Sequence, residues 1–330
     1  MKRLLEPARI GSRPYSRGFL ATLSAGAALL VGLAACSEPG PSGDLRIATG
    51  GPGGVYFDYG HGMADAVRAH LPDLSPEVLE TAASLDNIRM VVGGDAEVAF
   101  SLADSVSLAV NGDDPFGEPQ PVRALARLYD NYVHFVVAAE SDIWSLDDLR
   151  GHPVSTGAAG SGTEVIVDRL LEVAAMDPAS DIMRHRLNID ESAVALAAGE
   201  ISAFFFSAGL PTAAISELAD AERIRLIDLS EQVPQMRERF GELYSERSIP
   251  RSMYGLETTT TIGVPNYLVV REDMDESLAY ELTALLFNAR DELARAHQEA
   301  RRLNLRAAFS TYPVELHAGA IRYYRAARSG

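Results

Sequence analysis

Short apolar segments alternate along the chain with longer segments of helical periodicity, and this alternation limits the folds that the chain can adopt. The segment LRIATGG is typical of a short strand that runs into glycines, and a helix is predicted after it over residues 56–70. The strand PEVLET follows, and IRMVVGGDAEVAFSLAD then has the pattern of a helix, a glycine stop and a buried strand. VRALARLY and YVHFVVAAE are two more strand candidates. Strands that alternate with helices predict an α/β fold built from parallel layers.

A second series of the same kind begins after Glu140. SLDDLRGHPVSTGAAGSGTEVIVDRLLEVAAM has the pattern of helix, strand, glycine loop and helix. In addition, MVVGGDAEVAFSLAD and ALAAGEISAFFFSAG share one order: an apolar helix end, glycine, an acidic residue, and an apolar strand that opens into a loop. The 330 residues are enough for two domains of ordinary size. The repeat indicates two domains of similar build, although two ordinary βαβ units would give the same pattern.

The N-terminus has the pattern of an export signal. Residues 1–17 contain five basic residues and one acid, and the apolar run FLATLSAGAALLVGLAAC follows. This run is marginal as a permanent membrane span, whereas a basic region, a short apolar region and small residues at its end are typical of a secreted precursor. Leu33-Ala34-Ala35-Cys36 resembles the lipobox of bacterial lipoproteins, which implies cleavage before Cys36 and lipid attached to its sulfur. We therefore predict a lipoprotein signal peptide and lipidation site over residues 1–36 and a Pro/Gly-rich tether over residues 37–43.

Cysteine content and charge exclude several functions. Cys36 is the only cysteine, so the mature protein has no disulfide, no thiol nucleophile and no cysteine-based metal site. The net charge is −17, and such an acidic chain is not expected to bind nucleic acid, because phosphate contacts need clustered Lys and Arg. Small solutes and other proteins are the expected partners.

The loop TGAAGSGTEV, residues 156–165, has the glycine spacing of a phosphate-binding P-loop but lacks its lysine. Without that lysine and the following Ser/Thr, triphosphate binding loses its charge partner and its Mg²⁺ ligand. Ser161-x-x-Glu164 is a capping box and predicts a helix start. The free N–H groups of such a start attract a carboxylate or another small anion, and Gly160 and Gly162 allow close approach. A plain strand-to-helix turn with a good cap is the equal alternative.

The motifs of common enzymes are missing from the sequence. Neither G-x-S-x-G nor H-E-x-x-H occurs, and the seven histidines are scattered. Asp147 and Asp148 begin a predicted helix, where acids stabilise the helix dipole. Trp144, the only tryptophan, is expected to pack rather than to stack on a ligand. We therefore expect no enzymatic activity, no cofactor and no metal.

Several motifs, taken in order, resemble the TAXI family, the solute receptors associated with TRAP transporters. The resemblance runs from residue 45 to residue 324 and is strongest in SLDDLRGHPVSTGAAGSGTE. GGPGGVYFDYG is similar to the glycine-rich first loop of that family, and VRALARLYDNYVHFVV to its central strand pair. GLPTAAI, IPRSMYG, TTTTIGVPNYLVV and ELHAGAIRYY follow in the order of the family. Each motif is weak alone, but their order behind a lipoprotein signal is specific.

The resemblance implies the type II periplasmic binding protein fold, with two α/β domains around a ligand cleft. Domain I would comprise residues 44–138 plus 259–330, and domain II residues 139–258, with crossovers in VHFVVAAE and TTTTIGVP as hinge strands.

The resemblance also implies a function, that of an extracytoplasmic receptor that is lipid-anchored to the cell membrane, in the periplasm or at the cell surface. It would capture a small organic carboxylate of the acidic amino acid or dicarboxylate class. It would deliver this ligand, as a monomer, to the subunits of a TRAP-type membrane permease by hinge closure. The alternative is an orphan ligand-sensing lipoprotein that signals to a membrane partner without transport.

The ligand contacts that the resemblance implies are polar, aromatic or loop residues at the expected cleft: Tyr56, Ser84, Asn87, Asp104, Ser161, Gly162, Thr163, Gly209, Pro211, Tyr254 and Thr261. A packed aromatic is the alternative for Tyr56, and a helix cap is the alternative for Asp104.

The chain departs from the family pattern at two places. Ala82 and Ala83 follow Thr81 where the family has glycines, which stiffens this loop. Leu102 and Ala103 stand where the family often has Gln and Ser. These departures predict a more apolar cleft and make glutamate in particular a doubtful ligand.

Overall fold

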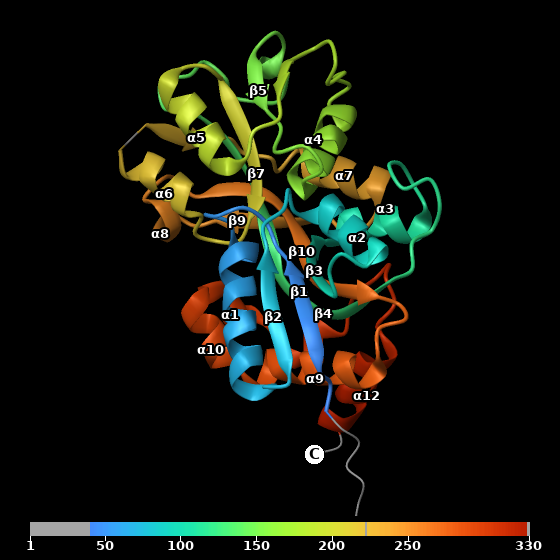
Figure 1. Ribbon diagram of the computed structural model, residues 1–330. Helices are drawn as coiled ribbons and strands as arrows, with labels where there is room; N and C mark the ends of the chain where they lie inside the picture. Colours follow the sequence, from blue (N-terminus) through green and yellow to red (C-terminus); the bar gives the residue numbers. More distant parts are fainter. Residues whose placement is uncertain (1–39, 222, 329–330) are drawn as a thin grey trace, which may run out of the picture. The chain divides into compact units, whose positions relative to one another are not determined.

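The computed structural model describes residues 40–221 and 223–328. In this part of the chain, ten strands form one sheet in the order β2-β1-β3-β10-β4-β7-β5-β6, with β8 beside β4 and β9 beside β10 (Figure 1). The strands are β1 (Gly43–Ala48), β2 (Leu74–Leu79), β3 (Val98–Leu102), β4 (Val122–Ala138), β5 (Pro153–Ser155), β6 (Met183–His185), β7 (Ala203–Ala208), β8 (Ile224–Leu226), β9 (Ser245–Ile249) and β10 (Thr259–Arg271).

Helices cover both faces of this sheet, so the predicted α/β fold is confirmed. They are α1 (Val55–His70), α2 (Ser84–Gly93), α3 (Ala103–Asn111), α4 (Gly162–Val173), α5 (Ile189–Ala198), α6 (Ala213–Asp220), α7 (Gln232–Phe240), α8 (Arg251–Tyr254), α9 (Glu276–Asn288), α10 (Arg290–Ala296), α11 (Leu305–Ala308) and α12 (Ala318–Ala327), with 3-10 turns η1 (Asp147–Leu149) and η2 (Gln298–Arg302).

The expectation of parallel layers is correct only for the outer strands. β1 pairs in parallel with β2 and β3, and β5 pairs in parallel with β6 and β7. The central strands β4 and β10 are antiparallel to each other and to their outer neighbours β7 and β3. The prediction of two strands in VRALARLY and YVHFVVAAE is also wrong, since both belong to β4. The antiparallel ladder with β10 continues through Asp130 and Asn131, which lie between the two segments.

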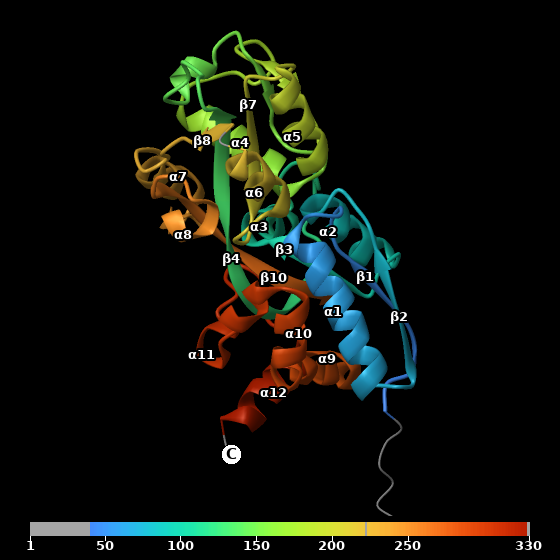
Figure 2. The ribbon, with the colours of Figure 1, turned by 90° about the vertical axis from the view of Figure 1, so that its left-hand side faces the viewer.

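Both central strands change partners along their length, as Figure 2 helps to follow. The first part of β4 pairs with β10, and from Tyr132 onward β4 pairs with β7. β10 in turn pairs with β9 up to Gly263 and with β3 and β4 beyond it. Gly263 and Tyr132 are register partners, so the two changes occur side by side. They lie close to the predicted crossovers, and we call residues 44–138 plus 259–330 lobe I and residues 139–258 lobe II.

In each lobe, helices pack on the two faces of the sheet. In lobe I, helices α1, α9 and α10 cover one face around Tyr59, Met63 and Leu293, while α2 and α3 cover the other around Ile88 and Val106. In lobe II, α4 and α7 cover one face of the sheet, where the buried side chains include Ile166, Leu170 and Met236. Helices α5 and α6 cover the other face, where the buried side chains include Leu196, Phe204 and Ile215. The chain thus buries two apolar layers on each half of one sheet.

Trp144 corrects a prediction, because it does not pack in a core. Its side chain is 70% exposed, and the Arg225 guanidinium lies 3.6 Å from the centre of its ring. A cation over an indole face needs no burial of the ring, and this contact holds the tryptophan on the surface of lobe II.

Candidate ligand-binding site

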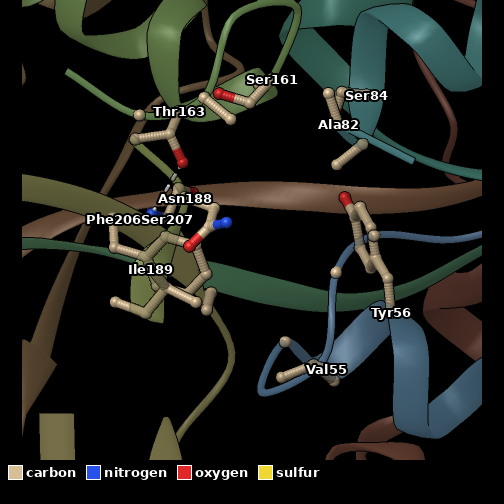
Figure 3. A pocket seen from close by; sticks show the side chains of 18 of the residues that line it. Val55, Tyr56, Ala82, Ser84, Ser161, Thr163, Asn188, Ile189, Phe206 and Ser207 are labelled. Atoms are coloured by element: carbon tan, nitrogen blue, oxygen red, sulfur yellow. Dashed lines mark hydrogen bonds between the residues drawn. The ribbon is translucent and has the colours of Figure 1, made fainter. Parts of the chain in front are cut away.

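A cavity of about 280 Å³ lies where the two lobes meet (Figure 3). Its wall comes from loops and helix starts that follow strands in both lobes, which is the usual place for ligands in α/β sheets. Lobe I contributes residues 50–52, 54–56 and 80–84 together with Leu102, Tyr129 and Asn131, and lobe II contributes parts of the segments 157–163, 187–190 and 206–208.

The loop before α4 is held rigidly against the cavity. Gly157 and Gly160 have positive φ angles of 93° and 80°, which a glycine adopts without strain. Ser161 is the N-cap, and its Oγ accepts a hydrogen bond of 3.1 Å from the Glu164 N–H. The expected capping box is only half formed, because the Glu164 carboxylate accepts from the Gly160 N–H and pairs with Arg184 and Arg186 instead. These contacts hold the Glu164 carboxylate at Gly160 rather than at the Ser161 N–H, and they stabilise the conformation of the glycine loop.

Three hydroxyls converge on this end of the cavity: Ser84, Ser161 and Thr163, here called the hydroxyl cluster. Each oxygen already accepts a hydrogen bond of 3.1 Å from a backbone N–H, of Leu102, Glu164 and Ser207 respectively. A hydroxyl whose oxygen accepts in this way still has its O–H to donate. The N–H groups of Gly162 and Thr163 have no acceptor among the described residues. This end of the cavity therefore presents donors, together with the positive end of the helix dipole.

A buried chain of hydrogen bonds runs from Tyr56 across the central strands. The Tyr56 hydroxyl donates to Asn266 Oδ1, Asn266 Nδ2 donates to Asn131 Oδ1 at 2.6 Å, and Asn131 Nδ2 donates to the Ser207 carbonyl at 2.8 Å. Burial raises the pKa of Tyr56 well above its ordinary value, and the nearby Ser84 hydroxyl opposes this rise. Tyr56 is thus a neutral phenol whose hydroxyl connects the cavity wall to both central strands, β10 and β4.

Tyr129 is a cavity residue that the sequence reasoning missed. It lies in β4 with only 3% of its surface exposed, and its hydroxyl has no hydrogen-bond partner among the described residues. Burial raises the pKa of this phenol well above its ordinary value. A buried hydroxyl without a partner costs free energy unless a ligand or water supplies one. Tyr129 is the last residue of the strand candidate VRALARLY, whose pattern predicts a strand but not a ligand contact.

The rest of the wall is mainly apolar. Apolar side chains from both lobes line it: Val55, Leu102, Ile189 and Phe206. Ala82 and Ala83, which depart from the family pattern, also line it. The prediction of a more apolar cleft thus agrees with the composition of the wall. Of the described residues that line the cavity, none is Lys, Arg or His, and the two charged ones are the exposed acids Glu80 and Asp190.

The structure brings together five of the predicted contact residues: Tyr56, Ser84, Ser161, Gly162 and Thr163 all line the cavity. The expectation of a cavity position is corrected for the other six, each of which is engaged elsewhere. The Asn87 amide donates to the carbonyls of Thr49 and Phe100, at 2.6 and 2.7 Å, and so fixes the strand ends of β1 and β3.

Asp104 lies behind the cavity wall. Its side chain is fully buried, accepts from the Ser105 N–H at 2.7 Å and from the Tyr244 hydroxyl at 2.9 Å, and does not cap its helix. Arg169 donates to the same hydroxyl at 2.7 Å. Burial raises the pKa of Asp104, and Arg169 and Tyr244 oppose this rise. Asp104 therefore belongs to a contact between α3 of lobe I and the α4–α7 side of lobe II.

The remaining four lie in the β7–α6 loop, α8 and β10. The Tyr254 hydroxyl bonds to His134 Nε2 at 3.0 Å and accepts from the Thr212 N–H at 2.9 Å, and the Thr261 hydroxyl donates to the Val133 carbonyl. A Cβ on Gly209 would lie 2.6 Å from Glu299 Cγ, so Gly209 is needed for close approach to lobe I rather than for a ligand. The Leu210–Pro211 peptide bond, next to Gly209 in the chain, is cis.

Cys36, the signal peptide and residues 37–39 of the tether lie outside the described residues. Among the helices of residues 40–221 and 223–328, none has both the length and the apolar character needed to cross a membrane.

Comparison with known proteins supports the fold. The chain is similar to the binding protein component of an ABC phosphonate transporter from Pseudomonas aeruginosa, with a TM-score of 0.56, 11% identity, and coverage of 78% of this chain and 79% of that chain. A protein of Bordetella bronchiseptica RB50 gives a TM-score of 0.52 at 18% identity, covering 86% of this chain and 89% of that chain. At these identities the similarity shows only that the chain shares the α/β fold of these two proteins.

The sequence model of one family covers most of the chain. It is described as the NMT1-like family, and it matches residues 47–327, from β1 to the end of α12. This protein therefore belongs to the NMT1-like family.

Proposed function

We propose that this protein is an extracytoplasmic receptor that captures a small organic carboxylate and delivers it to a TRAP-type membrane permease. The observation that carries the proposal is the donor end of the cavity. The hydroxyl cluster and the free N–H groups of α4 all offer hydrogens toward one place, and a carboxylate is an acceptor-only group. The unpartnered hydroxyl of Tyr129 is a second, independent sign that the cavity takes a polar ligand.

Hinge closure would bring the two lobes together around the ligand. β4 and β10 each pair with strands of both lobes, and their partners change at Tyr132 and Gly263. A rotation about these two points would separate residues 44–138 plus 259–330 from residues 139–258 and open the cavity. Lipid attachment at Cys36 would keep the receptor beside the permease, and the resemblance to TAXI receptors is the support for a TRAP-type partner. It also makes acidic amino acids and dicarboxylates the first compounds to test.

Titration calorimetry of the full chain in detergent tests the carboxylate. We expect heat of binding with at least one carboxylate and none with the matched amide. The variant Ser161→Ala/Thr163→Val should bind that carboxylate at least tenfold more weakly, because a hydrogen bond to a charged group contributes about 1.5–3 kcal/mol. Ser180→Ala, which removes an exposed hydroxyl away from the cavity, serves as the control. Equal affinity for acid and amide would reject the carboxylate proposal.

A further inference from the structure

The two ends of the cavity differ in character. In Figure 3 the hydroxyls of Ser84 and Ser161 lie at one end, whereas Val55 and Ile189 lie at the other. Leu102 faces the donor end closely, since a Cβ on Gly162 would lie 2.5 Å from Leu102 Cδ1. The hydroxyl cluster is thus at one end, and the remainder of the wall is mainly apolar, apart from a few neutral polar groups such as the Asn188 amide and the Tyr129 hydroxyl.

The charges of the wall lie at the apolar end. A Cβ on Gly53 would lie 3.4 Å from Asp190 Oδ1 and 4.0 Å from Ile189 Cγ2, and a Cβ on Gly51 would lie 3.8 Å from Glu80 Oε1. Both acids therefore flank the glycine loop that leads into Val55. No basic residue among the described ones lines this end. A negative group on the ligand would meet two carboxylates here and no counter-charge.

From these observations we infer that the ligand carries a single carboxylate on an uncharged, branched aliphatic or aromatic body. The inference rests on the proposed carboxylate site at α4 and narrows it. The carboxylate lies at the hydroxyl cluster, and the apolar body extends toward Val55, Ile189 and Phe206. Burial of apolar surface then favours the body, whereas a second carboxylate would lose its hydration without meeting a basic side chain. Glu80 and Asp190 add like-charge repulsion against dicarboxylates.

Four probes test this inference by calorimetry on the full chain: 4-methylpentanoate, glutarate and 4-methylpentanamide, which are of similar size, and phenylacetate, which has an aromatic body. We expect 4-methylpentanoate to bind at least tenfold more tightly than glutarate or 4-methylpentanamide. Glutarate binding as tightly as 4-methylpentanoate would overturn the single-carboxylate inference and leave the carboxylate receptor intact. The amide binding as tightly as the acid would reject the carboxylate site itself. Absence of binding by 4-methylpentanoate and by phenylacetate would overturn the inference for both kinds of apolar body.

The double variant Glu80→Gln/Asp190→Asn tests the source of the selectivity. Both side chains are exposed, so the fold should tolerate their replacement. The wild type should prefer 4-methylpentanoate over glutarate, and we expect this preference, as a ratio of affinities, to be about tenfold smaller in the double variant. Glu77→Gln removes an exposed acid of β2 that does not line the cavity, and it should leave the ratio as in the wild type. An unchanged ratio in the double variant would overturn the role of the two acids in excluding dicarboxylates.

Discussion

Ala83 has a backbone conformation that only glycine adopts without strain, with φ 78° and ψ −137°. It precedes α2 on the cavity wall, where the strained loop turns Ser84 toward the cavity. For a residue with a Cβ, such a conformation costs about 1–3 kcal/mol. Ala83→Gly should therefore raise the free energy of unfolding by about 1 kcal/mol, after about 0.5–1 kcal/mol is lost to the greater freedom of glycine.

Urea unfolding followed by circular dichroism measures this change. Ala82→Gly is the matched control, because the neighbouring residue has no positive φ, and it should lose about 0.5–1 kcal/mol. Equal losses in the two variants would show that Ala83 is not strained.

Tyr129 and Tyr59 both have buried hydroxyls without a partner among the described residues, but only Tyr129 lines the cavity. Tyr129→Phe and Tyr59→Phe should each raise the free energy of unfolding by about 1 kcal/mol, because each removes an unsatisfied polar group. Only Tyr129→Phe should weaken binding of the ligand, by about fivefold. Thermal unfolding and calorimetry of the two variants separate these effects. Equal affinities in both variants would exclude Tyr129 as a ligand contact.

His134 predicts how stability depends on pH. Its side chain is fully buried, Nδ1 faces the Phe206 carbonyl at 3.2 Å and Nε2 faces the Tyr254 hydroxyl at 3.0 Å, and burial lowers its pKa to about 4. In the unfolded chain its pKa is about 6.5, so below that pH the unfolded state binds the proton first. The contribution of neutral His134 to stability is present above pH 6.5 and is lost as the pH falls toward 4.

Between pH 7 and pH 5 the loss should be about 2 kcal/mol. Urea unfolding at the two pH values measures this change. In His134→Gln, which keeps a polar side chain at this place but does not titrate, the decrease should be smaller by that amount. The same decrease in both proteins would mean that other groups account for it.

At the scale of secondary structure, the local patterns predicted most elements well. The helix expected over residues 56–70 is α1, Val55–His70, and the pattern of helix, glycine stop and strand in IRMVVGGDAEVAFSLAD corresponds to α2 and β3. The α4 start at Ser161 was also predicted, because a capping residue acts within one turn. The errors concern long-range pairing. The continuity of β4 depends on β10, more than 120 residues away, and nothing within VRALARLYDNYVHFVV shows it.

The candidate site follows the same division. The predicted residues that line the cavity lie in glycine-rich loops and at helix starts, and a local pattern predicts both. Asn87 and Asp104 are polar residues near such loops as well, but their partners are the carbonyl of Phe100 and the hydroxyl of Tyr244. Whether a polar side chain hydrogen-bonds to buried groups of the core or faces a ligand depends on such distant partners. A single sequence does not show them.

The start of α4 offers a test of how closely an element approaches the cavity. An added Cβ at Gly162 would lie 2.5 Å from Leu102 Cδ1 and 2.6 Å from Ser84 Oγ, both buried. Gly162→Ala should therefore lower the free energy of unfolding by about 2 kcal/mol through overpacking. It should also weaken binding of the ligand, because the added methyl group displaces Ser84. Gly93→Ala, at the exposed end of α2, should instead be neutral or stabilising, because alanine favours helix. Differential scanning calorimetry compares the two. A loss of similar size in both would point to a backbone effect rather than a clash at the cavity.

At the scale of the whole described unit, the lobes touch on both sides of the cavity. On one side the Leu85 N–H donates to the Gly160 carbonyl at 3.1 Å, near the Asp104–Tyr244–Arg169 cluster. On the other side Glu299 Oε1 accepts from the Leu210 N–H at 3.1 Å. The hinge rotation proposed above would have to break these contacts. Two of the predicted ligand residues, Asp104 and Gly209, thus lie at contacts between the lobes rather than on the cavity wall.

Tyr244→Phe tests whether these contacts govern closure. The variant keeps the buried ring but removes the hydroxyl that joins Asp104 of lobe I to Arg169 of lobe II. Hydrogen bonds to charged groups contribute about 1.5–3 kcal/mol, so the closed arrangement should lose stability relative to the open one. A receptor that spends less time closed binds its ligand more weakly by the same factor, and we expect about a tenfold weaker affinity. Small-angle X-ray scattering without ligand should give a larger radius of gyration than the wild type, and saturating ligand should restore it.

Tyr323→Phe, on α12 away from the cavity, removes a tyrosine hydroxyl without touching lobe II and should change neither quantity. If Tyr244→Phe also leaves both unchanged, the Asp104–Tyr244–Arg169 contact stabilises the fold in the open and closed arrangements alike, and closure is governed by the Glu299 side of the cavity.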